Sequence, residues 1–549
     1  MIKADLIIHN GTVLTLDKDS TKGRSLTSYQ GRITGIWDAE KPPEEKIMRA
    51  EKVEEIDLNG KTIMPGFIDT HNHLLMYSQN KAQVNCSSPL HKSIKDIQAS
   101  VTKECSVKEK GEWILGYGYD DTMLDEKRHP SKEDLDAIST VHPIFIRHIS
   151  GHLAAANTVA LELAGVNKDT PKPDGGYFGK DQNGELTGVL YEPGAMDLVF
   201  DFVPIPSTEE IVELIRQGAL DYLAQGITTN TDAGVGLHLL EREFDAHILA
   251  VQSKANPMKM RLMILSYLLE KGGVFSEYTA VELDKEIRKK TNDRAKLDSA
   301  KLFQDGSIQG LTGALRKPYY CDDKLYGDLI YTQEQLNDYV LDFHQRGFRI
   351  ATHGNGDRAI NSIIESYESA INNGEQRDHH HRIEHVQTAT GEDLKKMKSL
   401  NIAASFFINH IYYWGDRHRD IFLGPERAKR MNALRDAKDL DMLYTLHSDC
   451  PITPISPLFS IWVAVNRVTR DGKVLGENQK IDVESALKSM TIYGAQLNFE
   501  EDEVGSIELG KAADFVVLNE NPVEIDPMRI KDIIVEMTII DGELAYKKP

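Results

Sequence analysis

Residues 62–73 have the sequence Thr62-Ile-Met-Pro-Gly-Phe-Ile-Asp-Thr-His-Asn-His, an apolar run that ends in a His-x-His pair. Alternate residues of a strand point to the same face, so His71 and His73 should emerge side by side at the carboxyl end of a strand. Two imidazoles in that arrangement can bind one metal ion. The pair is a weak signal by itself, because two histidines one residue apart occur by chance in many chains. A metal site therefore needs further ligands from other segments.

A rhythm of strands and helices extends along most of the chain. Strand-like runs rich in Ile, Val and Phe are each followed by a helical pattern, which is typical of a parallel sheet with crossover helices. The first expected strand spans residues 62–74, and the others are residues 227–232, 261–267, 301–305, 348–353, 382–386, 402–406 and 443–449. Eight such strands close a (β/α)8 TIM barrel, so we predict an α/β fold whose catalytic barrel continues over residues 226–500.

Both ends of the chain contain short apolar runs separated by turns. In residues 1–61, Asn10 and Gly11 lie between two such runs, which predicts a β-hairpin. Residues 501–549 have the same character. Neither piece has enough apolar residues for a core of its own, so we predict that both ends together form one small β-sandwich domain.

A long insertion separates the first and second barrel strands. A connection between a strand and the next helix normally has only a few residues. Residues 75–225 are therefore expected to form an inserted subdomain over the barrel mouth.

The composition excludes several classes of protein. The chain has 549 residues, too many for a single core, and its 64 basic and 85 acidic residues give a net charge of -21. This charge argues against nucleic acid or an anionic membrane as the main partner. The first residues lack a signal-peptide pattern, and no run of about 18 apolar residues occurs, so a cytoplasmic protein acting on a small molecule is expected. The four cysteines are too few and too scattered for a disulfide framework.

The functional groups of a (β/α)8 barrel lie at the carboxyl ends of its strands. The expected strands bring six candidates to that rim: His71 and His73 on the first, Lys301 at the opening of the fourth, His353 on the fifth, His385 on the sixth and Asp449 on the eighth. Each has an ordinary alternative, as a core or loop histidine, an ion-paired lysine or a turn-capping aspartate. All of these alternatives would have to hold at once, so we favour a metal centre.

These residues carry a family resemblance. The run Pro65-Gly-Phe-Ile-Asp-Thr-His-Asn-His, then Lys301, His353, His385, His447-Ser-Asp-Cys-Pro and Gly505-Ser-Ile-Glu-Leu-Gly-Lys-Ala-Ala-Asp-Phe-Val, resembles the amidohydrolase superfamily. Ser150-Gly-His-Leu, Gly175-Gly-Tyr, Asp305-Gly-Ser and His353-Gly-Asn-Gly-Asp, with the long insertion, look like its YtcJ-like branch, which includes N-substituted formamide deformylases. The resemblance covers essentially the whole chain.

The resemblance implies a set of metal ligands. His71 and His73 would bind one metal with Asp449, His353 and His385 would bind a second, and Lys301, carboxylated by carbon dioxide, would bridge the two. Imidazole and carboxylate ligands suit zinc first, with manganese, iron or nickel as alternatives. Without the lysine carbamate a single metal is expected.

The same ligands suggest a reaction. A bound metal lowers the pKa of water and polarises a carbonyl, and Asp449 is the candidate general base. We therefore predict a metal-dependent hydrolase that cleaves a C–N bond of an N-formyl, N-acyl or cyclic amide. Two other functions stay open: a mononuclear aminohydrolase acting on a nitrogen heterocycle, and a non-catalytic scaffold on the same fold. The oligomeric state is also open, a homodimer being the commonest assembly.

Substrate specificity is expected from the insertion and the late loops, since loops over a barrel mouth vary while strands hold the ligands. The candidate substrate-binding residues are Tyr119, Asp120, His152, His410 and Trp414. His410 would donate a hydrogen bond to the tetrahedral intermediate, or else be a structural loop histidine. Trp414 would line an apolar wall, or else be ordinary packing.

Overall fold

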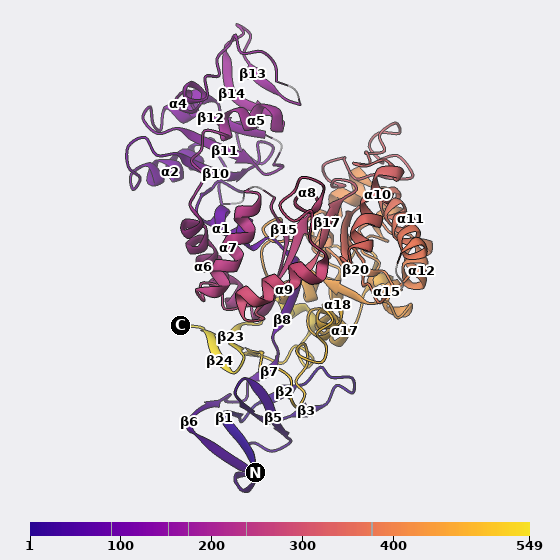
Figure 1. Cartoon of the computed structure of the whole chain (residues 1–549). Helices are drawn as coiled ribbons and strands as arrows, with labels where there is room; N and C mark the ends of the chain where they lie inside the picture. Colours follow the sequence, from indigo (N-terminus) through magenta and orange to yellow (C-terminus); the bar gives the residue numbers. More distant parts are fainter. Residues whose placement is uncertain (89, 152, 174, 238, 375–376) are drawn as a thin grey trace. The chain divides into compact units, whose positions relative to one another are not determined.

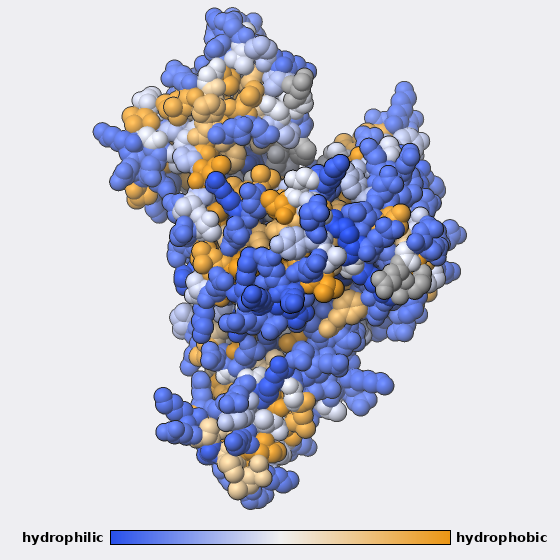
Figure 2. All heavy atoms as spheres, in the orientation of Figure 1, coloured by the Kyte–Doolittle hydropathy of each residue, from blue (hydrophilic) through white to orange (hydrophobic). Residues whose placement is uncertain are grey.

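A computed structural model of the chain describes residues 1–549 except 89, 152, 174, 238 and 375–376 (Figure 1). The chain divides into two compact units, Met1–Leu75 with Ile215–Pro549, and Met76–Leu214. Hydrophilic side chains cover most of the face shown in Figure 2. Within the described residues, no helix has both the length and the apolar character to cross a membrane.

The first unit is built around a sheet of eight parallel strands that follow one another in chain order. These strands are β8 (Phe67–Asn72), β15 (Ile227–Val235), β16 (Lys259–Leu265), β17 (Ala295–Phe303), β18 (Ile350–Gly354), β19 (Arg382–His385), β20 (Ala403–Phe406) and β21 (Tyr444–Leu446). All nine residues of β15 are buried, as expected of a parallel strand covered on both faces. The predicted (β/α)8 barrel is confirmed.

Helices connect these strands along the chain. The longer ones are α6 (Thr208–Ala224), α7 (Glu241–Gln252), α9 (Ala280–Thr291), α10 (Gln333–Gln345), α11 (Asp357–Asn373), α12 (Gly391–Ser399), α13 (His410–Arg417) and α16 (Pro457–Asn466). Shorter ones are α8 (Ser266–Leu269), α14 (Gly424–Ala428), α15 (Leu434–Asp439), α17 (Val483–Ser489) and α18 (Ile492–Leu497). Several begin at a reciprocal capping box, such as Thr279 with Glu282 at α9, which satisfies the first backbone amides of the helix.

The barrel closes where β21 meets β8. Thr70 Oγ1 and Thr445 Oγ1 lie 2.9 Å apart across this seam, and the His73 amide donates to the Cys450 carbonyl at 2.7 Å. In the described part of the chain no backbone ladder joins the two strands. The sheet is thus nearly closed, and isolated hydrogen bonds connect its two edges.

The chain ends form two further sheets of the first unit. One contains β5 (Arg32–Trp37), β4 (Ser25–Tyr29), β1 (Ile2–His9) and β6 (Ile47–Asp57). The other contains β24 (Glu543–Lys547), β23 (Val535–Ile540), β22 (Phe515–Leu518), β7 (Thr62–Pro65), β2 (Thr12–Leu14) and β3 (Lys22–Gly23). Leu6, Leu26, Phe515 and Ile539 belong to one buried cluster, so both ends of the chain contribute to a common core.

The second unit contains a mixed sheet with helices along its chain. Its strands are β13 (Tyr177–Lys180), β14 (Leu186–Tyr191), β12 (Leu153–Ala156), β11 (Ile144–His148), β10 (Ile114–Tyr119) and β9 (Val84–Asn85), and its helices are α2 (Ile94–Cys105), α3 (Lys132–Asp136), α4 (Thr158–Leu163) and α5 (Pro193–Phe200). Ile144 and Ile146 pack in a cluster with Ile97, whereas Phe145 between them packs with Leu161. The alternation shows that both faces of this sheet are buried.

Three local expectations differ from the structure. Asn10 and Gly11 do not join a hairpin, because β1 pairs with β4 and β6 while β2 pairs with β3 and β7. The segment 62–74 is two strands, not one: β7 belongs to the terminal sheet, and only β8 belongs to the barrel. Lys301 does not open the fourth barrel strand, which begins at Ala295, but lies near its carboxyl end.

Candidate metal centre

The end of β8 brings two imidazoles to one carboxylate. His71 and His73 place their Nε2 atoms 3.2 and 3.3 Å from Asp449 Oδ1. His71 is buried, and the side chain of Asp449 is only 10 % exposed. Asp449 has a φ of 52°, an unusual backbone conformation for a non-glycine residue and one that tends to occur at functional sites. The three side chains have the composition and spacing of a metal-binding group.

A second pair of imidazoles lies beside this group. His385 Nε2 is 2.9 Å from His353 Nδ1, and the rings of His71 and His385 are 5.0 Å apart. His385 ends β19 and also has a positive φ, 72°. The ring nitrogens of His71, His385 and His447 also lie within 4.8 Å of one another. The first, fifth and sixth barrel strands therefore bring their histidines to one place.

Lys301 is buried next to these groups. Only 1 % of the residue is exposed to solvent. Its Nζ has no hydrogen-bond partner among the described residues. Nζ lies 5.1 Å from the centre of the Phe303 ring. Burying a polar group without a hydrogen bond is unfavourable, so this amine is a candidate for a chemical role.

Burial strongly affects protonation in this region. It lowers the pKa of Lys301 to about 8, against the raising effect of Glu384 and Asp449. Burial and the nearby Lys301 lower the pKa of His353 to about 3. Burial alone would raise the pKa of Asp449, but contacts with His71 and His73 hold it well below its usual value. An anionic Asp449 and a neutral His353 are the forms that metal ligation requires.

The surroundings of His71 favour a positive charge. Burial and Lys301 oppose a charge on this ring, but Glu384 and Asp449 outweigh them and raise the pKa of His71. Its two ring nitrogens face these two carboxylates, at 2.6 Å from Glu384 and 3.2 Å from Asp449. A cation at this corner of the site is electrostatically favourable.

Two residues of the site were not assigned from the sequence. Glu384 Oε2 accepts a hydrogen bond from His71 Nδ1, and His447 Nε2 lies 3.1 Å from His385 Nδ1. The signal for Glu384 was its alternation with Arg382 in a short strand of the barrel, which puts an acid and a base on one buried face. His447 belongs to the run His447-Ser-Asp-Cys-Pro that carries the family resemblance, but the sequence alone assigned no role to its side chain.

A support for His353 comes from the loop after β17. Asp305 accepts backbone hydrogen bonds from Asn355, Gly356 and Ala314 at 3.0, 2.7 and 2.9 Å. The side-chain amide of Asn355 in turn contacts His353 Nε2 at 2.9 Å. These bonds fix the turn that follows β18 and orient its histidine.

Two predicted substrate-binding residues lie near the imidazoles. His410 is the first residue of α13, not a loop residue, and its ring is 6.4 Å from that of His385. Its Nδ1 is buried and has no hydrogen-bond partner among the described residues. Trp414 lies one turn later, with its ring 5.7 Å from that of His410. Phe407 contacts both rings and completes an aromatic wall beside His385.

The other predicted substrate-binding residues belong to the second unit. The hydroxyl of buried Tyr119 is 3.1 Å from His129 Nδ1, and Asp120 accepts hydrogen bonds from the backbone and hydroxyl of Thr122. His152 lies outside the described residues. Their role in binding stays a prediction.

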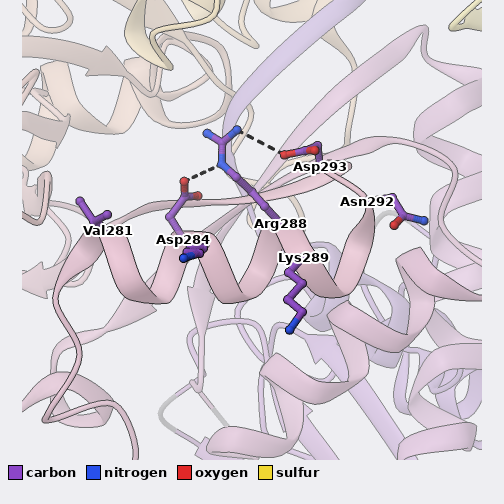
Figure 3. Close-up of a pocket in the computed structure, with 7 residues that line it drawn as sticks. Val281, Asp284, Arg288, Lys289, Asn292 and Asp293 are labelled. Carbon is purple, nitrogen blue, oxygen red and sulfur yellow. Dashed lines mark hydrogen bonds and ion pairs between the residues drawn. The ribbon is translucent and has the colours of Figure 1, made fainter.

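Two groups of charged side chains lie apart from the residues of this centre. Asp120, Asp121 and His148 have ligand atoms within 4.8 Å of one another, but the group is partly exposed and His148 already pairs with Asp121 at 3.1 Å. A shallow pocket on α9 is lined by Asp284, Arg288 and Asp293 among others (Figure 3). Arg288 pairs with both acids, at 2.5 and 3.6 Å, so these three side chains already have one another as partners.

The residues at the barrel rim fit a metal centre. Four imidazoles and one carboxylate are buried or largely buried with their ligand atoms close together. The buried Lys301 Nζ has no hydrogen-bond partner among the described residues and acts electrostatically on His71 and His353. Nitrogen and oxygen donors of this kind suit a divalent transition metal.

Comparison with known proteins agrees with the metal centre and with the family resemblance. The sequence profile of the amidohydrolase family matches residues 54–546. The chain belongs to the amidohydrolase family. The resemblance predicted from its motifs is thereby confirmed. The family is metal-dependent, and this amidohydrolase is a hydrolase that acts on carbon–nitrogen bonds.

Individual relatives match this amidohydrolase over almost their full length. It is 27% identical over 550 residues to the YtcJ protein of Bacillus subtilis (strain 168), with 99% of each chain covered. It is 28% identical over 557 residues to the N-substituted formamide deformylase of Arthrobacter pascens, covering 99% of this chain and 98% of that protein. The crystal structure of an uncharacterized metal-dependent hydrolase from Pyrococcus horikoshii OT3 has the same fold, with a TM-score of 0.76, 24% identity and coverage of 96% and 99%.

Proposed function

We propose that this amidohydrolase hydrolyses the C–N bond of a small N-formyl, N-acyl or cyclic amide at a centre of two divalent metal ions, zinc being the first candidate. One observation carries the proposal: the Nε2 atoms of His71 and His73 converge on Asp449 Oδ1 beside the touching pair His353 and His385. Such a set has enough nitrogen and oxygen donors for two ions.

The ligands divide into two subsites. The first subsite consists of His71, His73 and Asp449, and the second contains His353 and His385. Lys301 would belong to both, as a carbamate formed with carbon dioxide. An ammonium is cationic and cannot be a ligand, whereas a carbamate is an anion with two oxygens that suits two neighbouring cations. The buried Nζ, which has no hydrogen bond to any residue that the structure describes, supports this assignment.

The protein's own groups account for the proton transfers. When bound, divalent ions supply Lewis acidity toward water and a carbonyl group. A carboxylate oxygen of Asp449 takes a proton from the water molecule while the oxygen of that water bonds to the amide carbon. Asp449 then gives this proton to the amide nitrogen as the C–N bond breaks, so amide and water yield acid and amine. An N–H of His410 donates to the carbonyl oxygen while negative charge develops there.

The class of amide is supported by one relative. The Arthrobacter protein is named for N-substituted formamides, and it matches this chain from end to end. The aromatic wall of Phe407, His410 and Trp414 lies beside His385, which suits an apolar substituent on the substrate. N-substituted formamides are therefore the first substrates to test.

Metal analysis and a substrate panel test the proposal together. Purified protein should contain close to two equivalents of metal per chain, and amine release should be measured with N-substituted formamides, N-acyl amino acids and lactams. One equivalent, together with ammonia release from a nitrogen heterocycle, would support the mononuclear aminohydrolase instead. Trace metal and no turnover of any amide would contradict the proposal.

A further inference from the structure

The outer nitrogens of two metal-facing imidazoles have different partners. His71 Nδ1 is 2.6 Å from Glu384 Oε2, whereas His385 Nδ1 is 3.1 Å from His447 Nε2. All four side chains are almost completely buried. One imidazole is thus backed by a carboxylate and the other by a second imidazole.

Glu384 is held in place by a row of alternating charges inside the barrel. Its Oε1 accepts from Arg382 Nε at 2.6 Å, and Arg382 Nη2 lies 3.1 Å from Asp298 Oδ1. Asp298 Oδ2 in turn pairs with Arg349 Nη2 at 2.6 Å. A carboxylate that is paired in this way is an acceptor only, so His71 Nδ1 must carry the proton. His71 Nε2 is then left with its lone pair directed toward Asp449 and His73.

His447 offers a weaker acceptor. With His385 Nε2 as a ligand, His385 Nδ1 carries the proton and donates to His447 Nε2. His447 Nδ1 then carries its own proton and donates to the hydroxyl of Ser405, which is 2.8 Å away. Hydrogen bonds to an ionised acceptor are shorter and stronger than those to a neutral one, in line with 2.6 against 3.1 Å.

We propose that Glu384 is a positioning residue that makes His71 the strongest imidazole donor of the centre, so that the first subsite holds its ion more tightly than the second. A hydrogen-bonded carboxylate fixes the tautomer and orientation of a ligating histidine and raises its basicity. His447 has the corresponding role for His385, with a smaller effect because it is neutral. The inference rests on the metal ligands assigned under the proposed function.

Zinc transfer to a chromophoric chelator tests the inference in solution. The wild-type protein, loaded with two equivalents, should release its ions in two separate steps. Glu384→Gln should weaken the tighter step by about 10- to 100-fold and leave the other step unchanged. The matched control is Glu500→Gln, which removes an equally buried acid paired with Arg261 and Lys296, away from the ligands. Glu500→Gln should not change the zinc affinity of either release step.

The His447 position supplies the complementary pair of variants. His447→Leu removes the acceptor for His385 and should weaken only the looser step. His447→Gln keeps an oxygen acceptor and should restore part of the affinity. A merely structural role for Glu384 and His447 would instead move both steps together.

A measurement on the wild-type chain does not depend on any variant folding. Crystals of protein loaded with one equivalent of zinc should show anomalous scattering at the first subsite. Zinc found first at His353 and His385, or Glu384→Gln protein that releases zinc like the wild type, overturns the inference while leaving the proposed function intact. A wild-type chain that binds no zinc overturns the proposed function and this inference with it.

Discussion

His71 Nε2 and Asp449 Oδ1 lie 3.2 Å apart, and they come from opposite edges of the barrel sheet. His71 belongs to β8, the first barrel strand, and Asp449 follows β21, the last. The proposed first subsite therefore lies across the seam where the sheet closes. A metal ion bound there would join two strands that share no backbone ladder within the described residues.

Removing the metal should loosen this seam more than the rest of the barrel. Ligand binding stabilises the state that binds, by about 2.7 kcal/mol at a hundred times Kd. We expect amide hydrogen exchange to become faster in peptides covering β8 and β21 when a chelator is added, and to change little in β16, whose two neighbours are both hydrogen-bonded strands. Uniformly faster exchange across all eight strands would show that the metal does not stabilise the seam between β8 and β21 in particular.

Lys301→Ala should remove at least one of the two metal equivalents and abolish most of the amide hydrolysis. The reason is that the proposed carbamate would be the anion shared by the two ions, and alanine has no amine on which it could form. Metal content measured by atomic emission gives the result directly. Lys296→Ala is the matched control, since Lys296 lies on the same strand but pairs with Glu500. Full retention of both metals in Lys301→Ala would eliminate the carbamate bridge.

The barrel could be predicted from sequence because strand-like runs alternate with helical patterns along the chain, which is typical of parallel strands with crossover helices. Burial alone would not have revealed the strands, since buried β15 has the sequence Ile227-Thr-Thr-Asn-Thr-Asp-Ala-Gly-Val. The terminal domain was harder. Asn10 does have the positive φ, 58°, expected of an Asn-Gly turn. The turn nevertheless carries the chain from one sheet into another. Local turn chemistry fixes the backbone of a few residues and does not determine which strand pairs with which.

Part of the candidate site followed from one rule, that functional groups lie at strand ends. That rule identified His71, His353 and His385, which the structure brings together. It could not identify Glu384 or His447, because buried polar residues within or beside a strand are usually satisfied by other core groups. Only three-dimensional packing shows that their partners are the proposed ligands themselves.

His410→Ala should lower kcat by about 10²- to 10³-fold with little change in KM or metal content. Loss of one hydrogen-bond donor to a developing oxyanion has an effect of this size, since the interaction is strongest in the transition state. Steady-state kinetics with an N-substituted formamide and parallel metal analysis would measure it. His418→Gln is a suitable control, because His418 is also buried and its ring is 6.1 Å from that of His410. An equal fall in both variants would indicate a packing effect rather than a donor role.

Glu500→Gln should lower stability in a pH-dependent way. Burial opposes ionisation of Glu500, but Arg261, at 2.5 Å, and Lys296 outweigh it and lower its pKa from 4.5. A carboxyl with a depressed pKa in the folded state contributes its full stability above pH 4.5, and this contribution is lost as the pH falls through the lowered value. The variant should therefore melt earlier than wild type at pH 7, by the equivalent of about 3 kcal/mol, because breaking a buried pair leaves the basic groups uncompensated. The difference should shrink as the pH is lowered below 4.5.

The control is Glu503→Gln, which breaks an exposed pair with Arg32. It should change the melting temperature little at pH 7 or at low pH. A difference between Glu500→Gln and wild type that stays constant down to low pH would show that the stabilisation is not electrostatic.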